Sequence, residues 1–312
     1  MRKMFENKLN LLRRVGFLLG TLAFVLTGCG RANVTVPEDE IPQIQEQSQE
    51  NTQQSAQTSE NTTASDTTLT ITAIKEGAAD AFVLMSGDHV TIIDTGLEKK
   101  SDRLIDFLDE QGVTRVDEII ITHFDKDHVG GADHVIDNYD VGTIYTTYQS
   151  KDSDDITSYR EAMERKGLSE TVVSKETTFN AGDISFTIYP PMAKSYNEKT
   201  SNNSSLVIKV TLGEKSMLFA GDAEAERIKE LLATKGIQCD ILKVPHHGRY
   251  APNSEAFIDY VAPKYAIITS GKSETEDQEI LDILTKKGIE TYLTRNGNIT
   301  ITMTSDKVTI SQ

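Results

Sequence analysis

The sequence is poor in the residues that build aromatic cores and disulfide-linked scaffolds. Its 312 residues include no tryptophan, two cysteines and seven prolines, and aromatic residues make up only 6%. Because hydrophobic residues reach just 38%, we expect part of the chain to lie outside any core. The chain also has no Gly-rich P-loop and no serine-nucleophile elbow, so neither of these two catalytic motifs can account for its function.

Basic residues are scarce relative to acidic ones. The chain has 32 lysines and arginines against 48 aspartates and glutamates, which gives a net charge of −16. Residues 1–29 contribute +4 to this total, so the remaining residues carry −20. A surface of that sign repels polyanions at long range, and we therefore do not expect broad, non-specific affinity for DNA. A small phosphodiester, or a strand held by a metal ion, stays compatible with this charge.

The first 28 residues have the features of an export signal. A basic segment precedes the apolar run 15–26, which ends at Leu26-Thr27-Gly28-Cys29. The run is shorter than the roughly 20 residues that a transmembrane helix needs, and its end is similar to the bacterial lipobox. We predict a lipoprotein signal peptide over residues 1–28 and a lipid on Cys29, which would anchor the chain to the cell membrane on its extracytoplasmic face. An uncleaved N-terminal anchor is the alternative, with the same location.

A polar segment follows the predicted lipid anchor. Residues 29–67 are rich in Gln, Glu, Ser, Thr and Asn and have almost no large apolar side chains. Such a segment cannot bury enough surface to offset the entropy of ordering, so we predict a disordered tether. We predict one globular domain over residues 68–312. With Cys29 lipidated, Cys239 is the one remaining cysteine, so no intrachain disulfide is predicted. Cys239 lies in an apolar run and is expected in the core.

The strongest functional signal is a group of metal-ligating residue types after a short apolar run. Residues 118–121 predict a buried strand, and His123, Asp125, Asp127 and His128 follow it within six residues. A turn at the strand end can direct these side chains at one point, with a spacing that suits two adjacent metal ions. Similar residue types recur after later apolar runs, at Asp222, His246 and His247. A solvated charge cluster is the alternative explanation of the first group.

These segments resemble the metallo-β-lactamase superfamily, and within it the C-terminal metallohydrolase domain of ComEC-type competence proteins. The resemblance covers roughly residues 68–312. Besides the group at residues 123–128, it rests on Ile93-Asp94-Thr95-Gly96, Asn203-Ser204-Ser205-Leu206, Leu218-Phe219-Ala220-Gly221-Asp222 and Lys243-Val244-Pro245-His246-His247-Gly248.

The hydrophobic periodicity predicts alternating groups of strands and helices. Strands are expected at residues 69–74, 81–86, 90–94, 118–121, 184–189, 205–212, 216–220, 241–244, 265–269, 291–293, 298–304 and 307–311. Helices are expected at residues 101–111, 132–139, 154–166, 223–235, 254–261 and 275–287. Strand groups followed by helices, twice over, fit an α/β fold with four αββα layers. The resemblance implies the same metallo-β-lactamase sandwich, with metals at one edge between the sheets.

The resemblance also implies roles for individual residues. The implied ligands of two divalent ions are His123, Asp125, Asp127, His128, Asp222 and His247. Asp222 would bridge the ions, and Asp127 would also take part in catalysis. We favour His247 as the ligand and His246 as the catalytic contact to the substrate or leaving group, and the reverse order stays open.

Three more residues are expected around the metals. The resemblance implies that Asp94 braces the loop of the first group by hydrogen bonds. No histidine fills the first-site position before Asp222, and Asn203 lies where that ligand is expected, so Asn203 could contact the metal or the substrate. Arg249 could hold a phosphate. Because oxygen ligands favour Mn²⁺ and imidazoles suit Zn²⁺, both cofactors stay open.

The predicted function is that of an exported, membrane-anchored, binuclear metal-dependent hydrolase. A ComEC-like phosphodiesterase or nuclease using a metal-activated water is the first hypothesis, and no protein partner is predicted. A phosphoesterase for phosphorylcholine or another headgroup or wall component is the second. A surface binding module with a degenerate metal site is the third, and it depends on the missing first-site histidine. Hydrolysis of β-lactam antibiotics is the least supported, because the carboxylate-rich group departs from the lactamase pattern.

Overall fold

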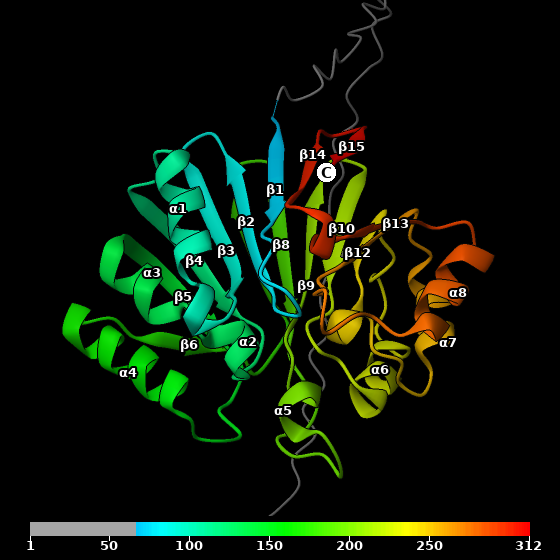
Figure 1. Cartoon of the computed structure of the whole chain (residues 1–312), viewed down its shortest axis with the longest axis horizontal. Helices are drawn as coiled ribbons and strands as arrows, with labels where there is room; N and C mark the ends of the chain where they lie inside the picture. The colour runs from blue at the N-terminus through cyan, green and yellow to red at the C-terminus, as the bar shows by residue number, and fades with distance from the viewer. Residues whose placement is uncertain (1–66) are drawn as a thin grey trace, which may run out of the picture. The chain divides into compact units, whose positions relative to one another are not determined.

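The computed structural model describes residues 67–312. The predicted signal peptide, Cys29 and residues 29–66 of the predicted tether lie outside the described residues, and the predicted domain boundaries stay predictions. Two sheets pack face to face, with helices on their outer faces (Figure 1). This arrangement confirms the predicted α/β fold class with four layers. Among the described residues, no helix has the length and apolar character that a membrane crossing requires.

The first sheet has eight strands in the order β15, β14, β1, β2, β3, β4, β5, β6. Its strands are β1 (Leu69–Ala73), β2 (Ala81–Ser86), β3 (His89–Thr95), β4 (Arg115–Ile121), β5 (Asp140–Thr146), β6 (Glu170–Val172), β14 (Ile299–Met303) and β15 (Val308–Ser311). Strands β3 to β6 pair in parallel, and the others pair antiparallel.

The second sheet has seven strands in the order β13, β12, β11, β10, β9, β8, β7. Its strands are β7 (Thr177–Ala181), β8 (Ile184–Tyr189), β9 (Val207–Leu212), β10 (Lys215–Phe219), β11 (Ile241–Lys243), β12 (Tyr265–Ile268) and β13 (Glu290–Leu293). Strands β10 to β13 pair in parallel.

Helices cover the outer face of each sheet. The first sheet carries α1 (Asp102–Glu110), α3 (Ala132–Asn138) and α4 (Asp154–Lys166), and the second carries α6 (Ala225–Leu231), α7 (Ser254–Val261) and α8 (Gln278–Lys286). The short helices α2 (Lys126–Val129) and α5 (Thr200–Asn203) and the 3-10 turn η2 (Pro245–Gly248) lie at one edge. Two further 3-10 turns are η1 (Glu98–Lys100) and η3 (Thr294–Asn296).

The continuous apolar run of β4 is explained by burial on both of its faces. Ile120 belongs to the core between the two sheets, whereas Ile119 and Ile121 belong to the core beneath α1, α3 and α4. Successive side chains of a strand point to opposite faces, so a strand covered on both sides needs apolar residues at every position. Polar residues, beginning with Thr122 and His123, follow directly after the end of β4. They lie at the edge of the sheet where the candidate metal ligands are found.

The sequence did not predict β5, β6 and β7. The alternation of β5 is interrupted by Gly142, whose missing side chain allows the backbone oxygen of Asp117 to approach. Strand β6 has only three residues, and none of them is buried. Parallel pairing with β4 defines β5, and such pairing leaves no local pattern in the sequence.

A buried carboxyl between β1 and β2 gives the fold a specific pH dependence. Glu76 is fully buried, its Oε2 accepts a 3.0 Å hydrogen bond from the Leu97 backbone N–H, and its Oε1 has no partner. Burial raises the pKa of Glu76 from 4.5 to about 7. The folded state therefore binds this proton more tightly than the unfolded state, so stability falls as pH rises from 4.5 to about 7 and levels off above that.

Glu76→Gln is expected to remove this part of the pH dependence. The variant should match the wild type near pH 4 and exceed its free energy of unfolding by up to about 3 kcal/mol at pH 8, since each pKa unit corresponds to roughly 1.4 kcal/mol. Urea unfolding followed by circular dichroism at both pH values measures this difference. Glu110→Gln, at the exposed end of α1, is the matched control. Parallel pH profiles for wild type and Glu76→Gln would contradict the expectation.

Candidate metal centre

Four polar side chains, from α2, from the turn after β10 and from η2, converge at the edge of the sheets where β4, β10 and β11 end. Each of Asp127, His128, Asp222 and His247 offers one ligand atom, and these atoms all lie within 4.8 Å of one another. His128 Nε2 lies 3.2 Å from Asp222 Oδ1, and His247 Nε2 lies 3.4 Å from Asp222 Oδ2 and 3.3 Å from Asp127 Oδ2. The cluster unites residues that are far apart in the sequence.

The inward-facing atoms of this cluster lack hydrogen-bond partners. His123 Nε2, His128 Nε2, His247 Nε2 and Asp222 Oδ1 are buried and unpartnered. Buried polar atoms are nearly always satisfied, so several such atoms facing one another are the arrangement expected of residues that would bind a cation. Imidazole nitrogens and carboxylate oxygens are ligands for Zn²⁺ and Mn²⁺. The residues present therefore fit a divalent metal ion.

The opposite ring nitrogens are held by neighbouring residues. His128 Nδ1 lies 2.8 Å from Asp94 Oδ2, and His247 Nδ1 lies 3.0 Å from Thr269 Oγ1. Such contacts fix the orientation and tautomer of a histidine and direct Nε2 at the metal. Asp94 also accepts 2.7 Å hydrogen bonds from the N–H and hydroxyl of Thr122, so its carboxylate joins β3 to the loop after β4. This is the brace position expected for Asp94.

Electrostatics within the cluster favour charge pairing. Burial alone would lower the pKa of His128, but Asp222, Asp94 and Asp80 together raise it well above its ordinary value. Burial would likewise raise the pKa of Asp222, yet His128, His247 and Lys243 hold it well below its usual range. Asp222 is thus held as a carboxylate, which is the charge state that a metal ligand requires, whereas His128 would have to release a proton to bind a metal.

A buried ion pair that the sequence reasoning missed supports this cluster from behind. Lys243 is fully buried, and its ammonium pairs with Asp80. The ammonium also donates a 2.9 Å hydrogen bond to the Gly221 carbonyl and lies 3.5 Å from Asp222 Oδ1. Asp80 Oδ1 accepts a 2.5 Å hydrogen bond from Thr269 and lies 3.3 Å from His247 Nδ1. In the sequence, the one signal for this ion pair is that each partner is a charged residue beside an apolar strand. Asp80 precedes β2 and Lys243 ends β11.

Comparison with known proteins decides the family. The model of the metallo-beta-lactamase superfamily matches residues 74–272. The chain belongs to the metallo-beta-lactamase superfamily. It is 32% identical over 203 residues to ComE operon protein 3 of Bacillus subtilis (strain 168). This alignment covers 63% of this chain and 26% of that protein. It is 26% identical over 213 residues to Recombination protein 2 of Haemophilus influenzae, over 67% of this chain and 25% of that protein.

These matches confirm the predicted relationship to ComEC-type competence proteins, and the chain spans about a quarter of the length of these relatives. Among solved structures, the metallo-beta-lactamase fold protein YhfI from Bacillus subtilis is similar with a TM-score of 0.50. That match covers 78% of this chain and 100% of that chain at 11% identity, so it supports the fold alone. Metal-dependent hydrolysis is characteristic of this superfamily, which agrees with the cluster at the sheet edge.

The two neighbouring histidines of η2 have different surroundings. Both adopt left-handed backbone conformations, with φ of 47° at His246 and 53° at His247, which non-glycine residues rarely accept outside functional sites. His247 is buried inside the cluster. His246 is partly exposed; its Nδ1 lies 2.8 Å from Glu224 Oε1 and its Nε2 3.9 Å from Asp222 Oδ2. This geometry favours His247 as the ligand and His246 as the residue facing the substrate.

The ligands expected for the first metal are less complete. His123 Nε2 lies 3.9 Å from both Asp125 Oδ2 and Asp222 Oδ2, but among the described residues these three do not form a group whose ligand atoms all lie within 4.8 Å of one another. Asn203 does not point toward them, because its Oδ1 accepts from the Arg227 N–H and its Nδ2 donates to the Glu198 carbonyl, both at 2.9 Å. The structure therefore gives Asn203 a role in holding its loop rather than the contact that the sequence suggested.

Two other residues lie near the site without a direct contact to the cluster. Asn202, rather than Asn203, faces the site, with Nδ2 3.3 Å from His246 Nε2. Arg249 pairs with Asp277 at 3.0 Å, and its side chain is 42% exposed, so a phosphate would have to compete with this carboxylate. The role of Arg249 in holding a phosphate stays a prediction.

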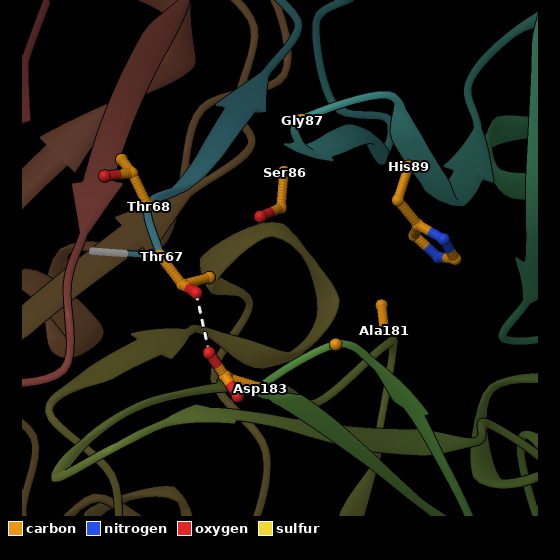
Figure 2. A pocket seen from close by; sticks show the side chains of 8 residues that line it. Thr67, Thr68, Ser86, Gly87, His89, Ala181 and Asp183 are labelled. Carbon is orange, nitrogen blue, oxygen red and sulfur yellow. Dashed lines mark hydrogen bonds between the residues drawn. The ribbon is translucent and has the colours of Figure 1, made fainter. Parts of the chain in front are cut away.

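A polar pocket of about 500 Å³ lies at the opposite end of the sheets (Figure 2). His89 at the start of β3 lines it, and the His89 ring lies 2.8 Å from Glu118 Oε2. Thr67 donates a 2.7 Å hydrogen bond to Asp183 across the pocket. None of the candidate metal-ligand groups among residues 67–312 lies here, so the pocket is separate from the metal centre.

Proposed function

We propose that this protein is an exported, membrane-anchored hydrolase that cleaves phosphodiester bonds with the help of divalent metal ions. The observation that carries the proposal is the convergence of Asp127, His128, Asp222 and His247 with their unpartnered atoms turned inward. The similarity to Recombination protein 2, whose name refers to recombination and so to nucleic acid, supports the choice of a phosphodiester substrate. The predicted signal peptide and lipid on Cys29 support the location.

The residues of the site divide the work of such a reaction. Metal ions bound there would stabilise developing negative charge and lower the pKa of a water molecule. Asp222 Oδ2 lies 3.9 Å from His123 Nε2 and 3.4 Å from His247 Nε2, which supports the proposal that Asp222 would be a ligand shared by both ions. Zinc and manganese both fit this mixture of imidazole and carboxylate ligands, and we propose that two ions bind.

His246 is placed to assist the leaving group. Glu224 Oε1 lies 2.8 Å from its Nδ1, within ion-pair distance, and Nε2 lies on the side of Asp222 and Asn202. A histidine next to a carboxylate at the rim of a metal site can donate a proton to a departing alkoxide. His246 is therefore the proposed general acid, and His247 is the ligand.

The test is hydrolysis of linear DNA and of bis(4-nitrophenyl) phosphate by the full-length chain, with Mn²⁺ or Zn²⁺ added. Cleavage of DNA that is lost in the Asp127→Ala, His128→Ala double variant would support a ComEC-like nuclease. Cleavage of the small diester alone would favour a phosphoesterase for headgroups or wall components. If neither substrate is turned over in a manner sensitive to the double variant, the phosphodiesterase proposal is wrong and a binding module with a degenerate site becomes the better account.

A further inference from the structure

Lys151, in the loop between β5 and α4, contacts the metal centre from the solvent side. Its ammonium lies 2.5 Å from Asp125 Oδ1, and the hydroxyl of Ser201 donates to the same oxygen. The other oxygen of Asp125, Oδ2, faces His123 Nε2 at 3.9 Å. One oxygen of the Asp125 carboxylate is thus bound by Lys151 and Ser201. The second oxygen faces His123 and stays available for the first metal.

The loop that carries Lys151 is held in place by a chain of contacts. Gln149 donates hydrogen bonds to the Lys151 carbonyl at 3.0 Å and to Asp152 Oδ1 at 2.7 Å, and it accepts a 3.1 Å hydrogen bond from Arg160. The guanidinium of Arg160 lies 5.5 Å from the centre of the Phe124 ring. Phe124 is the residue between His123 and Asp125 in the sequence. The loop is therefore linked through Arg160 to the segment that carries His123 and Asp125. This contact reduces the entropy cost of positioning Lys151 there.

Lys151 is also a cation that a substrate can reach. Among the described residues, Lys151 and Lys243 are the lysines that pair with carboxylates of the cluster and its surroundings. Lys243 is fully buried and bound to Asp80, whereas the Lys151 side chain is 39% exposed. An anionic substrate that approaches this carboxylate-rich site needs accessible positive charge near the metals.

We propose that Lys151 binds a nonbridging phosphoryl oxygen of the substrate, which makes a phosphodiester anion, rather than a neutral ester or lactone, the preferred class. This inference rests on the proposed function and extends it to substrate recognition. An ammonium group has three donors, and one carboxylate oxygen occupies only part of them. A metal ion bound to Asp125 would neutralise part of the carboxylate charge. The attraction between Asp125 and Lys151 would then weaken, and Lys151 would be free to bind the phosphate.

Replacement of Lys151 by methionine tests this role. In the Mn²⁺-loaded full-length protein, Lys151→Met is expected to raise the KM for the diester that the wild type cleaves, linear DNA or bis(4-nitrophenyl) phosphate, roughly tenfold with little change in kcat. The dissociation constant of inorganic phosphate, measured by calorimetry, should rise by a similar factor. Metal affinity should not weaken, because Lys151 competes with the ion for Asp125. Lys151→Arg should retain most of the phosphate affinity.

The matched control is Lys264→Met. Lys264 lies 3.5 Å from Asp240 before β12, at the end of the sheet away from the site, and its loss should change neither constant. Unchanged phosphate affinity in Lys151→Met would overturn the inference. So would a loss of metal affinity equal to the loss of phosphate affinity, since that would mean that Lys151 only positions Asp125. If the wild type cleaves no diester, the proposed function fails, and the phosphate titration still decides the role of Lys151.

Discussion

Asp222→Asn is expected to lower kcat/KM for a phosphodiester roughly 10³-fold or more, because several kcal/mol of charge stabilisation depend on the metal ions that this carboxylate holds. The Asp222 oxygens lie 3.2 to 3.9 Å from ring nitrogens of His123, His128, His246 and His247. Asparagine keeps the shape of the side chain and removes its charge and one of its acceptor oxygens. Metal analysis of the purified variant should show loss of bound Zn²⁺ or Mn²⁺ together with the loss of turnover.

Asp240→Asn provides the matched control for this substitution. Asp240 accepts a 3.1 Å hydrogen bond from the Ser216 N–H and pairs with Lys264, at the end of the second sheet away from the metal centre. This variant should keep both its metal content and its activity. An Asp222→Asn protein that retains full metal content and wild-type turnover would show that Asp222 is not a ligand.

Asp80→Asn is expected to destabilise the fold by about 3–5 kcal/mol, because it removes the nearer of the two carboxylates beside the buried ammonium of Lys243 and leaves only Asp222 at 3.5 Å. Burial would raise the pKa of Asp80, but Lys243, His128 and His247 hold it well below its ordinary value. A depressed carboxyl pKa contributes stability at neutral pH that is lost only as the pH falls below about 4. Urea unfolding at pH 7, followed by circular dichroism because the chain has no tryptophan, measures the loss.

A double replacement separates the two roles of this ion pair. Asp80→Val with Lys243→Met removes both charges, and apolar side chains of similar size can replace a buried pair with little loss of stability. The double variant should therefore regain much of the stability that Asp80→Asn loses. It should still bind metal roughly 10–100-fold more weakly, because His247 and Asp222 lose the groups that orient them. Restoration of metal affinity along with stability would limit Asp80 and Lys243 to a structural role.

Much of the fold was predictable because its pattern is local. Residues 118–121 predicted a buried strand, and β4 extends from Arg115 to Ile121. Residues 154–166 predicted a helix, and α4 has these bounds, with Ser153 accepting a 3.2 Å hydrogen bond from the Ile156 N–H and Gly167 in a left-handed conformation after its end. By contrast, β6 and the interrupted alternation of β5 depend on pairing with neighbouring strands, and the sequence alone does not display such pairing.

The site shows the same division. His123, Asp125, Asp127 and His128 could be found because they are close in sequence and of a chemically distinctive type. Asp80 could not be found in this way, because the residue that explains it, Lys243, follows 163 positions later in another sheet. Lys151 was missed for a similar reason, since a single lysine in a polar loop has no signature until the fold places it against Asp125. Direct ligands form patterns, whereas the residues that support them depend on tertiary contacts.

The most direct test of the central claim is the position of the metal in a crystal of the full-length protein grown with Mn²⁺, located by anomalous diffraction. The structure predicts one strong peak within coordination distance of Asp127, His128, Asp222 and His247, and a second, weaker peak between His123, Asp125 and Asp222. Among the described residues, Glu98, Asp133 and His134 form another candidate group on the surface. A peak at that group alone, with none between Asp222 and His247, would contradict the proposed metal centre and the hydrolase mechanism built on it.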